Sequence, residues 1–322
     1  MDVEHHCMRP TDLAQHYIDR HVFNSHTANI FLATARILER EFPGILIAEF
    51  NSDKVELWRK RTLSRVKVHS YNTYLRHLRI LFKHAALQGL VKDNSFMSVR
   101  YINCKLRPKT IHNDDIRHII HQVETDAIVK PGWFWAMVIR FLLNTAIRRR
   151  QLVNLRWHHI DMERKQIRLS QEGSKNTLEW SIPITESTLD DLRILKQKLE
   201  SIGVIPRPEE QVFNPKPFCP GMTLRELSGR KLTETFATIS MRTGIRISPH
   251  RLRHTLGTRL GTAEHANIVA IQQLMGHASI TSTRIYVSCP MDYVRQVLER
   301  DGFEQELNNL KLQKRYKGTT QT

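Results

Sequence analysis

The stretch "PHRLRH", Pro249 to His254, says more about this chain than any other, because it places two histidines and two arginines within six residues. On a helix, the four-residue spacing puts His250 and His254 on one face. Paired imidazoles can ligate zinc, whereas paired guanidinium groups can bind a phosphate. The stretch alone therefore leaves two alternatives, a metal centre and an anion clamp.

The residues around the two histidines favour the anion clamp. A zinc peptidase has a glutamate directly after the first histidine as its general base, and here that position is Arg251. Arg253 adds a second permanent charge in the same turn. Two guanidinium groups beside a dication repel it, but beside a phosphate they stabilise the anion. We expect no metal ion at this site.

The formal charge of the 322-residue chain is +17, which predicts a polyanionic partner. The charge is not confined to a tail, because Lys and Arg outnumber Asp and Glu by 6 over residues 1–106 and by 11 over residues 107–322. With 40% hydrophobic residues, the chain is expected to be globular. Double-stranded DNA fits such a surface, and a generic basic surface or a membrane-facing patch stays open as the alternative.

A membrane-spanning or secreted protein is not expected. The one long apolar stretch, "WFWAMVIRFLLNTAI" from Trp133, includes Arg140 and is too short to span a bilayer, so it predicts a buried helix. The first residues, "MDVEHHCMRP", lack the apolar core of a secretory signal. The cysteines have no pairing pattern, which favours reduced thiols in a cytoplasmic, nucleoid-associated protein: Cys7, Cys104, Cys219 and Cys289.

A helix with a basic surface is predicted in the N-terminal third of the chain. "YNTYLRHLRILFKHAAL", residues 71–87, places its apolar side chains on one helical stripe. Between Lys54 and Lys92 there are ten Lys or Arg residues and one acidic residue, Glu56. We predict contacts with DNA phosphates there, with a solvated charged face as the alternative. The candidate contacts are Lys60, Arg61, Arg65, Lys67, Arg76, Arg79 and Lys83.

A linker and a β-hairpin are predicted in the rest of the chain. "NCKLRPKTIHNDD", residues 103–115, loses the apolar periodicity, contains Pro108 and ends on an acidic pair that favours a helix start. "KQIRLS" and "LEWSIPI" alternate apolar and polar residues on either side of "QEGSKN". This pattern predicts a hairpin with Lys175 at its turn. Beyond residue 186 the pattern is helical again.

A nucleophile for phosphate chemistry is present in "LMGHASITSTRIYV", Leu274 to Val287. His277 follows a glycine, and Tyr286 comes nine residues later, after a hydroxyl-rich segment. A phenol has a pKa of about 10 and attacks poorly at neutral pH unless neighbouring cations or a base favour its phenolate. A tyrosine among apolar neighbours is also a common core residue, so both roles stay open for Tyr286.

Together these motifs resemble those of the tyrosine recombinases, a family that includes phage integrases, the Xer recombinases and Cre. "PHRLRH", "LMGH" and "RIY" occur in the family's order and spacing. "NTAIRRRQLVNL" is similar to its first arginine box, with the arginine at Arg148, and Lys175, eight residues before Pro183, matches its hairpin lysine. "NTYLRHLRILFKHAALQGLVKDNS" resembles its core-binding domain. The resemblance covers nearly the whole chain.

The resemblance implies a mainly α fold with a small β-sheet, divided into two domains. We expect an all-α core-binding domain over residues 8–106 and a mixed α+β catalytic domain over residues 107–300. The two are expected to clamp duplex DNA from opposite sides. A tail of residues 301–322 is expected to contact a neighbouring protomer, and the segment before the first domain is expected to be too short for a further arm-binding domain.

The resemblance also implies a role for each matched residue. Tyr286 would attack a DNA phosphodiester and form a 3'-phosphotyrosine, while Arg148 and Arg253 would hold the non-bridging oxygens. The remaining roles are hydrogen bonding and proton transfer by His250 and His277, and protonation of the departing 5'-oxygen by Lys175. No metal or nucleotide cofactor is expected, because the covalent link conserves the energy of the broken bond.

The implied partners are double-stranded DNA with specific recombination sites and further copies of the chain. Four protomers would assemble on two sites and exchange strands through a Holliday junction, with accessory DNA-bending proteins as further candidates. A type IB topoisomerase shares this chemistry, and a DNA-binding regulator derived from a recombinase would share the basic surface. The motifs leave open whether the outcome is integration, excision, inversion or dimer resolution.

Two positions depart from the family pattern. Ala146 stands where the first arginine box has a glycine, and Gln151 stands where it commonly has an acidic residue. A neutral amide cannot favour a protonated histidine as a carboxylate does. His254 is expected to buttress His250 on the same helical face. Surface or DNA-backbone contacts are expected from Arg149, Arg150, Arg251 and Arg284.

Overall fold

The computed structural model describes residues 8–104, 108–126, 128–170, 179–263, 266–277 and 279–286. Within these ranges the chain is mostly helical and has one three-stranded antiparallel sheet, which confirms the expected fold class. The chain divides into two compact units at residue 106, inside the segment predicted as a linker. Each unit has a hydrophobic core of its own.

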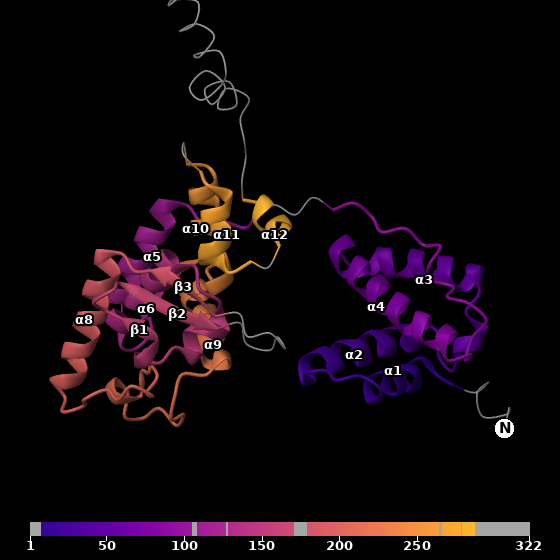
Figure 1. Cartoon of the computed structure of the whole chain (residues 1–322), viewed down its shortest axis with the longest axis horizontal. Helices are drawn as coiled ribbons and strands as arrows, with labels where there is room; N and C mark the ends of the chain where they lie inside the picture. The colour runs from indigo at the N-terminus through magenta and orange to yellow at the C-terminus, as the bar shows by residue number, and fades with distance from the viewer. Residues whose placement is uncertain are drawn as a thin grey trace, which may run out of the picture. The chain divides into compact units, whose positions relative to one another are not determined.

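The N-terminal unit is a small helical bundle, drawn in indigo and purple in Figure 1. Its helix α4 packs against the three others, and the apolar stripe predicted there is buried around Tyr71, Leu75 and Phe82. Trp58 stacks on Tyr71 with ring centroids 5.4 Å apart. The elements are α1 (Pro10–Asp19), α2 (Ser25–Glu41), the 3-10 turn η2 (Ile47–Glu49), α3 (Ser52–Arg65) and α4 (Val68–Leu87).

The C-terminal unit combines helices with the small sheet (Figure 1), and residues of both form its main hydrophobic core. Its first helix starts at the acidic pair of the linker, as predicted, because carboxylates favour the positive end of the helix dipole. The elements are α5 (Asn113–Thr125), α6 (Gly132–Thr145), α7 (Arg149–Asn154), η3 (Trp157–His159), β1 (Ile160–Asp161), β2 (Gln166–Ser170), β3 (Glu179–Pro183), α8 (Glu186–Glu200), η4 (Lys216–Phe218), α9 (Gly229–Thr243), α10 (Pro249–Gly261), α11 (Ile268–Met275) and α12 (Ile280–Arg284).

Helix α6 is the centre of this core and contacts α5, α8 and α10. It is the buried helix predicted from the apolar stretch at Trp133, because most of its side chains are apolar and buried and its one charged residue is Arg140. That guanidinium is neutralised by Asp191 at 2.9 Å and by Glu124 at 2.8 Å. Among the described residues, no helix is long and apolar enough to cross a membrane.

The predicted hairpin is confirmed by strands β2 and β3, which pair antiparallel. Ile167 lies opposite Ile182, and Leu169 lies opposite Trp180. The alternation expected from the sequence places Ile167, Leu169 and Ile182 in the core. The hairpin turn, residues 171–178, lies outside the described residues, and Lys175 lies with it.

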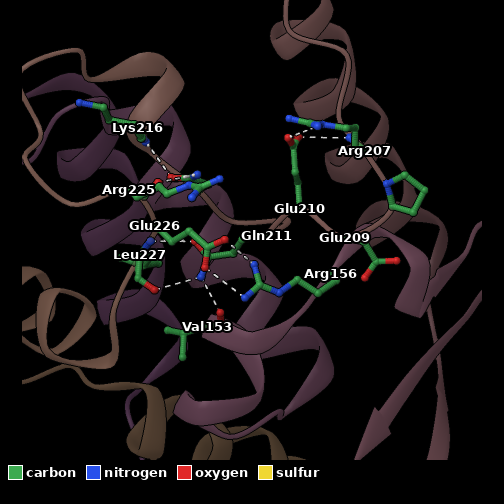
Figure 2. A network of polar contacts seen from close by, with 12 residues as sticks. Val153, Arg156, Arg207, Glu209, Glu210, Gln211, Lys216, Arg225, Glu226 and Leu227 are labelled. Atoms are coloured by element: carbon green, nitrogen blue, oxygen red, sulfur yellow. Dashed lines mark hydrogen bonds and ion pairs between the residues drawn. The ribbon is translucent and has the colours of Figure 1, made fainter.

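A polar network holds α7 against the segment that leads into α9 (Figure 2). The Gln211 side chain donates to the carbonyls of Val153, at 2.5 Å, and Leu227, at 2.9 Å, and accepts from the Leu227 N–H at 2.8 Å. Arg156 makes a bidentate ion pair with Glu226 at 2.7 and 3.1 Å. These bonds join three segments of the chain at the C-terminal end of α7, the helix that Arg148 precedes.

Candidate active site

Five of the six residues predicted to be catalytic come together in the C-terminal unit, from four separate segments. Arg148 precedes α7, His250 and Arg253 lie on α10, His277 follows α11, and Tyr286 follows α12. The sixth, Lys175, lies outside the described residues. Hydrogen bonds between these segments, rather than closeness in sequence, hold the group together.

Arg253 is the most constrained member of the group and is only 4% exposed. Its Nη1 donates to the carbonyl of Ala146 at 2.6 Å, and its Nη2 donates to the carbonyl of Met275 at 2.5 Å and to Nε2 of His277 at 2.9 Å. Burial, and then the charge of Arg148, lower the pKa of Arg253 to about 10. The guanidinium therefore stays protonated at neutral pH and is held in one orientation before any anion binds.

Ala146 ends helix α6 in the left-handed conformation, with φ of 52°. A residue with a Cβ is strained there, which explains why the related arginine box has glycine at this position. The turn aims the Ala146 carbonyl at Arg253 and starts the segment that carries Arg148. Alanine therefore adopts here the left-handed conformation that glycine takes without strain.

Arg148 is fixed by both its backbone and its side chain. Its N–H donates to Oε1 of the buried Gln151 at 2.8 Å, so the amide caps the first turn of α7. Its Nη2 donates to the carbonyl of Gly276 at 2.9 Å. Burial lowers the pKa of Arg148, and the nearby Tyr286 opposes this shift. Gln151 therefore positions Arg148 and brings no negative charge to the site.

His277 is neutral, because one of its ring nitrogens accepts a hydrogen bond and therefore has no proton. Nε2 accepts from Arg253, so the ring proton is on Nδ1, which donates to Oγ1 of Thr283 at 2.9 Å. Burial and the charges of Arg253 and Arg148 lower the pKa of His277 to about 4. The preceding Gly276 has φ of 54° and lies so close to the Trp180 indole that a Cβ would overlap it.

Tyr286 is buried in a small core, and its hydroxyl has a polar partner; its role as nucleophile stays a prediction. Its ring packs in a small apolar cluster with Ala146, Ile271 and Met275. Its hydroxyl hydrogen bonds with Nδ1 of His254 at 2.7 Å. Burial raises the pKa of Tyr286, while the charges of Arg253 and Arg148 act in the opposite direction. The Tyr286 ring is therefore part of the core, while its hydroxyl is bonded to His254 and is influenced by the charges of Arg253 and Arg148.

The contact between Tyr286 and His254 was missed by the sequence analysis, which predicted only that His254 buttresses His250. The Nε2 atoms of His254 and His250 do lie 2.8 Å apart. The second contact joins residues 32 positions apart, and spacing along one helix cannot indicate it. Both nitrogens of His254 therefore have partners within the protein. Among the described residues, no three His, Cys, Asp or Glu side chains are grouped so that they could hold a metal ion.

Two glycines on α10 were also missed, and they make room for Tyr286. A Cβ at Gly257 would lie 3.1 Å from two carbons of the Tyr286 ring, and a Cβ at Gly261 would overlap the Tyr286 carbonyl. Together with His250 and His254 they follow one face of the helix, at steps of four, three and four residues. The signal available in the sequence was a pair of glycines four residues apart, on the helical face that carries the histidine pair.

The arginines expected to serve as surface contacts are mostly exposed. Arg150 and Arg284 are exposed, as is Arg149, whose Nη1 donates to Oγ1 of Thr233 at 2.7 Å. Arg251 is half-buried, and its Nη1 donates to the carbonyl of Arg246 at 2.5 Å. Whether they contact DNA stays a prediction.

The predicted DNA contacts in the N-terminal unit fall into two groups. The guanidinium of Arg79 donates to the carbonyls of Phe96, Met97 and Val99 and lies 4.5 Å from the ring centroid of Tyr101. It therefore braces the end of its own unit, a role that the sequence did not indicate. Arg61 and Arg65 are bonded to Glu41. The second group is exposed and makes no side-chain hydrogen bond or ion pair among the described residues: Lys60, Lys67, Arg76 and Lys83.

Comparison with known proteins agrees with this geometry. Residues 109–291, more than half of the chain, match the model of the phage integrase family. A protein of Pseudomonas syringae named as a tyrosine recombinase XerC is 28% identical over 306 residues, which cover 91% of this chain. The chain spans 64% of the length of that relative.

Solved structures share the fold of the chain. The integrase of the Tn1549 transposon, in complex with a circular intermediate DNA, has a TM-score of 0.73 at 19% identity and covers 91% of this chain and 99% of its own. A lambda integrase tetramer bound to a Holliday junction has a TM-score of 0.66 at 16% identity and covers 86% of this chain and 76% of its own. By its matched residues and its fold, the chain belongs to the phage integrase family.

Proposed function

We propose that the chain is a site-specific DNA recombinase that cleaves and rejoins DNA through a 3'-phosphotyrosine at Tyr286. The observation that carries the proposal is the position of the Tyr286 hydroxyl, in contact with His254 and within the electrostatic influence of Arg148 and Arg253. Membership in the phage integrase family supports the same chemistry. A tyrosine that served packing alone would need neither the cations nor the histidine at its hydroxyl.

The reaction needs a stabiliser for the charge that develops on phosphorus. Arg148 and Arg253 would bind the non-bridging oxygens of the scissile phosphate, and their guanidinium groups are already held by carbonyls on neighbouring segments. Pre-oriented donors of this kind lower the barrier because they need no rearrangement as the charge forms. His277 fixes one side of Arg253, and Lys175 is proposed as the acid that protonates the 5'-oxygen.

The N-terminal unit would supply much of the DNA affinity. Its exposed cations on α3 and α4, among them Lys60 and Arg76, suit contacts with phosphates that carry no sequence information. We propose that the two units hold duplex DNA together and that four protomers pair two sites through a Holliday junction. The lambda integrase tetramer, itself bound to such a junction, supports this assembly. Residues 301–322, outside the described residues, and DNA-bending proteins are candidates for further contacts.

Covalent trapping tests the proposal. Nicked duplexes tiled across the DNA that flanks the gene would be incubated with the full chain, and adducts that survive SDS would be mapped. We expect an adduct with the wild-type chain and none with Tyr286→Phe, which should still bind the same duplex. An adduct with the phenylalanine variant would move the nucleophile elsewhere, with Tyr293, outside the described residues, as the first position to examine.

A second assay separates recombination from topoisomerase activity. A type IB topoisomerase would relax any supercoiled plasmid as a monomer, whereas a recombinase needs its mapped site. We expect joined products only when two copies of the mapped site are present. Relaxation of a plasmid that lacks the site, at the same rate, would favour the topoisomerase.

A further inference from the structure

We propose that His254 is the base that takes the hydroxyl proton of Tyr286 and that a second proton then moves from His254 to His250. The inference rests on the proposed function, since the proton leaves as Tyr286 attacks a phosphodiester. The distances describe a continuous path, 2.7 Å from the Tyr286 hydroxyl to Nδ1 of His254 and 2.8 Å from Nε2 of His254 to Nε2 of His250. Both steps are within the reach that a general base requires.

The other histidine near the nucleophile is not placed for this task. His277 stacks almost parallel to the Tyr286 ring, at 11° and with centroids 6.2 Å apart. Its Nε2 accepts from Arg253, and its Nδ1 bonds with Thr283. Neither nitrogen has a lone pair available to the phenol. Among the described residues, the one hydrogen-bond partner of the Tyr286 hydroxyl is therefore His254.

The direction of the two hydrogen bonds follows from exposure. If Tyr286 donates to His254, then His254 donates from Nε2 to His250, and the remaining ring proton lies on Nδ1 of His250. His250 is exposed, so water can accept that proton. The reverse direction would leave the phenol proton of Tyr286, which is 4% exposed, without an acceptor among the described residues. A buried donor without a partner costs about 1–3 kcal/mol, so the first direction prevails.

The helix surface beside His254 is shaped to keep the phenol in this contact. Gly257 lies one turn after His254, and its missing side chain leaves the space that the Tyr286 ring fills. Gly261 admits the Tyr286 backbone one turn further on. The two glycines let the tyrosine pack against α10, and His250 and His254 lie on the same face of that helix. The contact is thus a product of helix packing and not of a flexible side chain.

The proposed step balances in atoms and charge. The Tyr286 oxygen forms a bond to phosphorus as its O–H bond breaks and the proton moves to Nδ1 of His254. The proton on Nε2 of His254 moves to Nε2 of His250, which becomes an imidazolium. The bond from phosphorus to the 5'-oxygen then breaks, and that oxygen takes its proton from the general acid. The positive charge on His250 arises as negative charge develops on the phosphorane, and the reverse transfer serves rejoining.

The charges that face His254 keep the base weak until DNA is bound. Burial, followed by His250 and Arg253, lowers the pKa of His254 to about 4. Tyr286 faces it from the segment after α12, and His277, after α11, interacts with it electrostatically. A phosphate bound by Arg253 would offset part of that positive charge and raise the pKa of His254. Nucleophile activation would then be coupled to DNA binding.

The test uses the full chain and the nicked duplex on which the wild-type chain forms its adduct. His254→Asn places an amide oxygen near the position of Nδ1, so it can accept the phenol hydrogen bond but cannot take the proton. We expect it to form the adduct about 10²-fold more slowly. Thermal denaturation and duplex affinity should stay near wild-type values. Gly257→Ala, which pushes the phenol away from α10, should lower the rate in the same direction.

Fluorinated tyrosine at position 286 separates a base from a positioning residue. Fluorine lowers the pKa of the phenol, so the defect of His254→Asn should shrink severalfold on that background if His254 acts as the base. In the wild-type chain the rate should fall as pH is lowered through the pKa of His254 on DNA. The asparagine variant should lose that dependence. An unchanged defect with fluorotyrosine and an unchanged pH profile would overturn the inference.

The outcomes distinguish this inference from the proposed function. No adduct with the wild-type chain on any duplex would count against the recombinase itself. An adduct with the wild-type chain, none with Tyr286→Phe, and a wild-type rate with His254→Asn would retain the recombinase and remove His254 as the base.

Discussion

Arginine is used differently at two places in this protein, the basic surface of α3 and α4 and the site built around α10. On α4, Arg76 is exposed. On α10, Arg253 is buried and bonded to two carbonyls and a histidine. Exposed charges attract a polyanion from many directions and are screened by salt. Buried, pre-oriented charges act on one atom in one geometry.

The comparison teaches that a basic sequence does not reveal what each arginine does. Arg79 follows Arg76 by three residues, yet its guanidinium braces three backbone carbonyls within the N-terminal unit. In its bonding it resembles Arg253 more than its neighbour. Whether an arginine binds DNA, stabilises its own unit or takes part in catalysis depends on the groups around its guanidinium. Substitutions at Arg76, Arg79 and Arg253 can distinguish these three roles.

The largest expected effect is on cleavage by Arg253→Lys. A lysine keeps the positive charge but cannot reproduce the fork that reaches Ala146, Met275 and His277 together. We expect adduct formation to slow by about 10²- to 10³-fold. Single-turnover rates on the nicked duplex measure this, with Arg76→Lys as the matched control at an exposed site. Equal rates for the two variants would erase the distinction between the regions.

Arg79→Ala should affect stability instead of chemistry. Its loss leaves the carbonyls of Phe96, Met97 and Val99 without a charged donor, and we expect the N-terminal unit to lose about 2 kcal/mol. Arg76→Ala should change stability by less than about 0.5 kcal/mol. Amide hydrogen exchange along α4 in the two variants reports the difference. Equal protection in both would mean that the carbonyl bonds contribute little.

Acid should destabilise the C-terminal unit through its neutral histidines. His254 and His277 have pKa values of about 4 in the folded chain, against 6.5 for a free imidazole. Between these values the unfolded chain binds more protons, so stability is lost as pH falls from about 6.5 to about 4. Each histidine contributes at most about 1.4 kcal/mol per pH unit. Denaturant unfolding at several pH values measures this. The free energy of unfolding should depend less steeply on pH for His254→Asn than for the wild-type chain.

Ala146→Gly should stabilise the turn that positions Arg148. Glycine tolerates the φ of 52° that alanine holds at a cost, and the carbonyl that accepts from Arg253 keeps its place. We expect a gain of about 1 kcal/mol, measured by denaturant unfolding, and an unchanged rate of adduct formation. A loss of stability would indicate that burial of the Ala146 methyl group outweighs the strain.

The smallest expected effect concerns the exposed cations. Lys60→Ala should lower the slope of log affinity against log salt by about 0.9, the value for one lost phosphate contact. Arg79→Ala, with its guanidinium already bonded, should leave the slope unchanged. Duplex binding measured over a series of salt concentrations compares the two. A flat response to Lys60→Ala would assign that side chain to a solvated face.

Much of the fold followed from local patterns. The stripe of α4, the buried helix α6, the acidic start of α5 and the pairing of β2 with β3 were all predicted and are confirmed. Each depends on periodicity or on turn chemistry within about twenty residues. The roles of Lys175 and of residues 301–322 stay predictions, since both lie outside the described residues.

The candidate site likewise has a part that the sequence indicated and a part that only the packing of the chain decided. Motif spacing was sufficient to select five residues that the structure brings together, Arg148, His250, Arg253, His277 and Tyr286, and their catalytic roles stay predictions. It could not indicate that Ala146 bonds to Arg253, 107 positions away, or that His254 meets the nucleophile. Those partners are set by the packing of α6, α10, α11 and α12, which brings distant segments within hydrogen-bond distance and excludes the water that would otherwise compete.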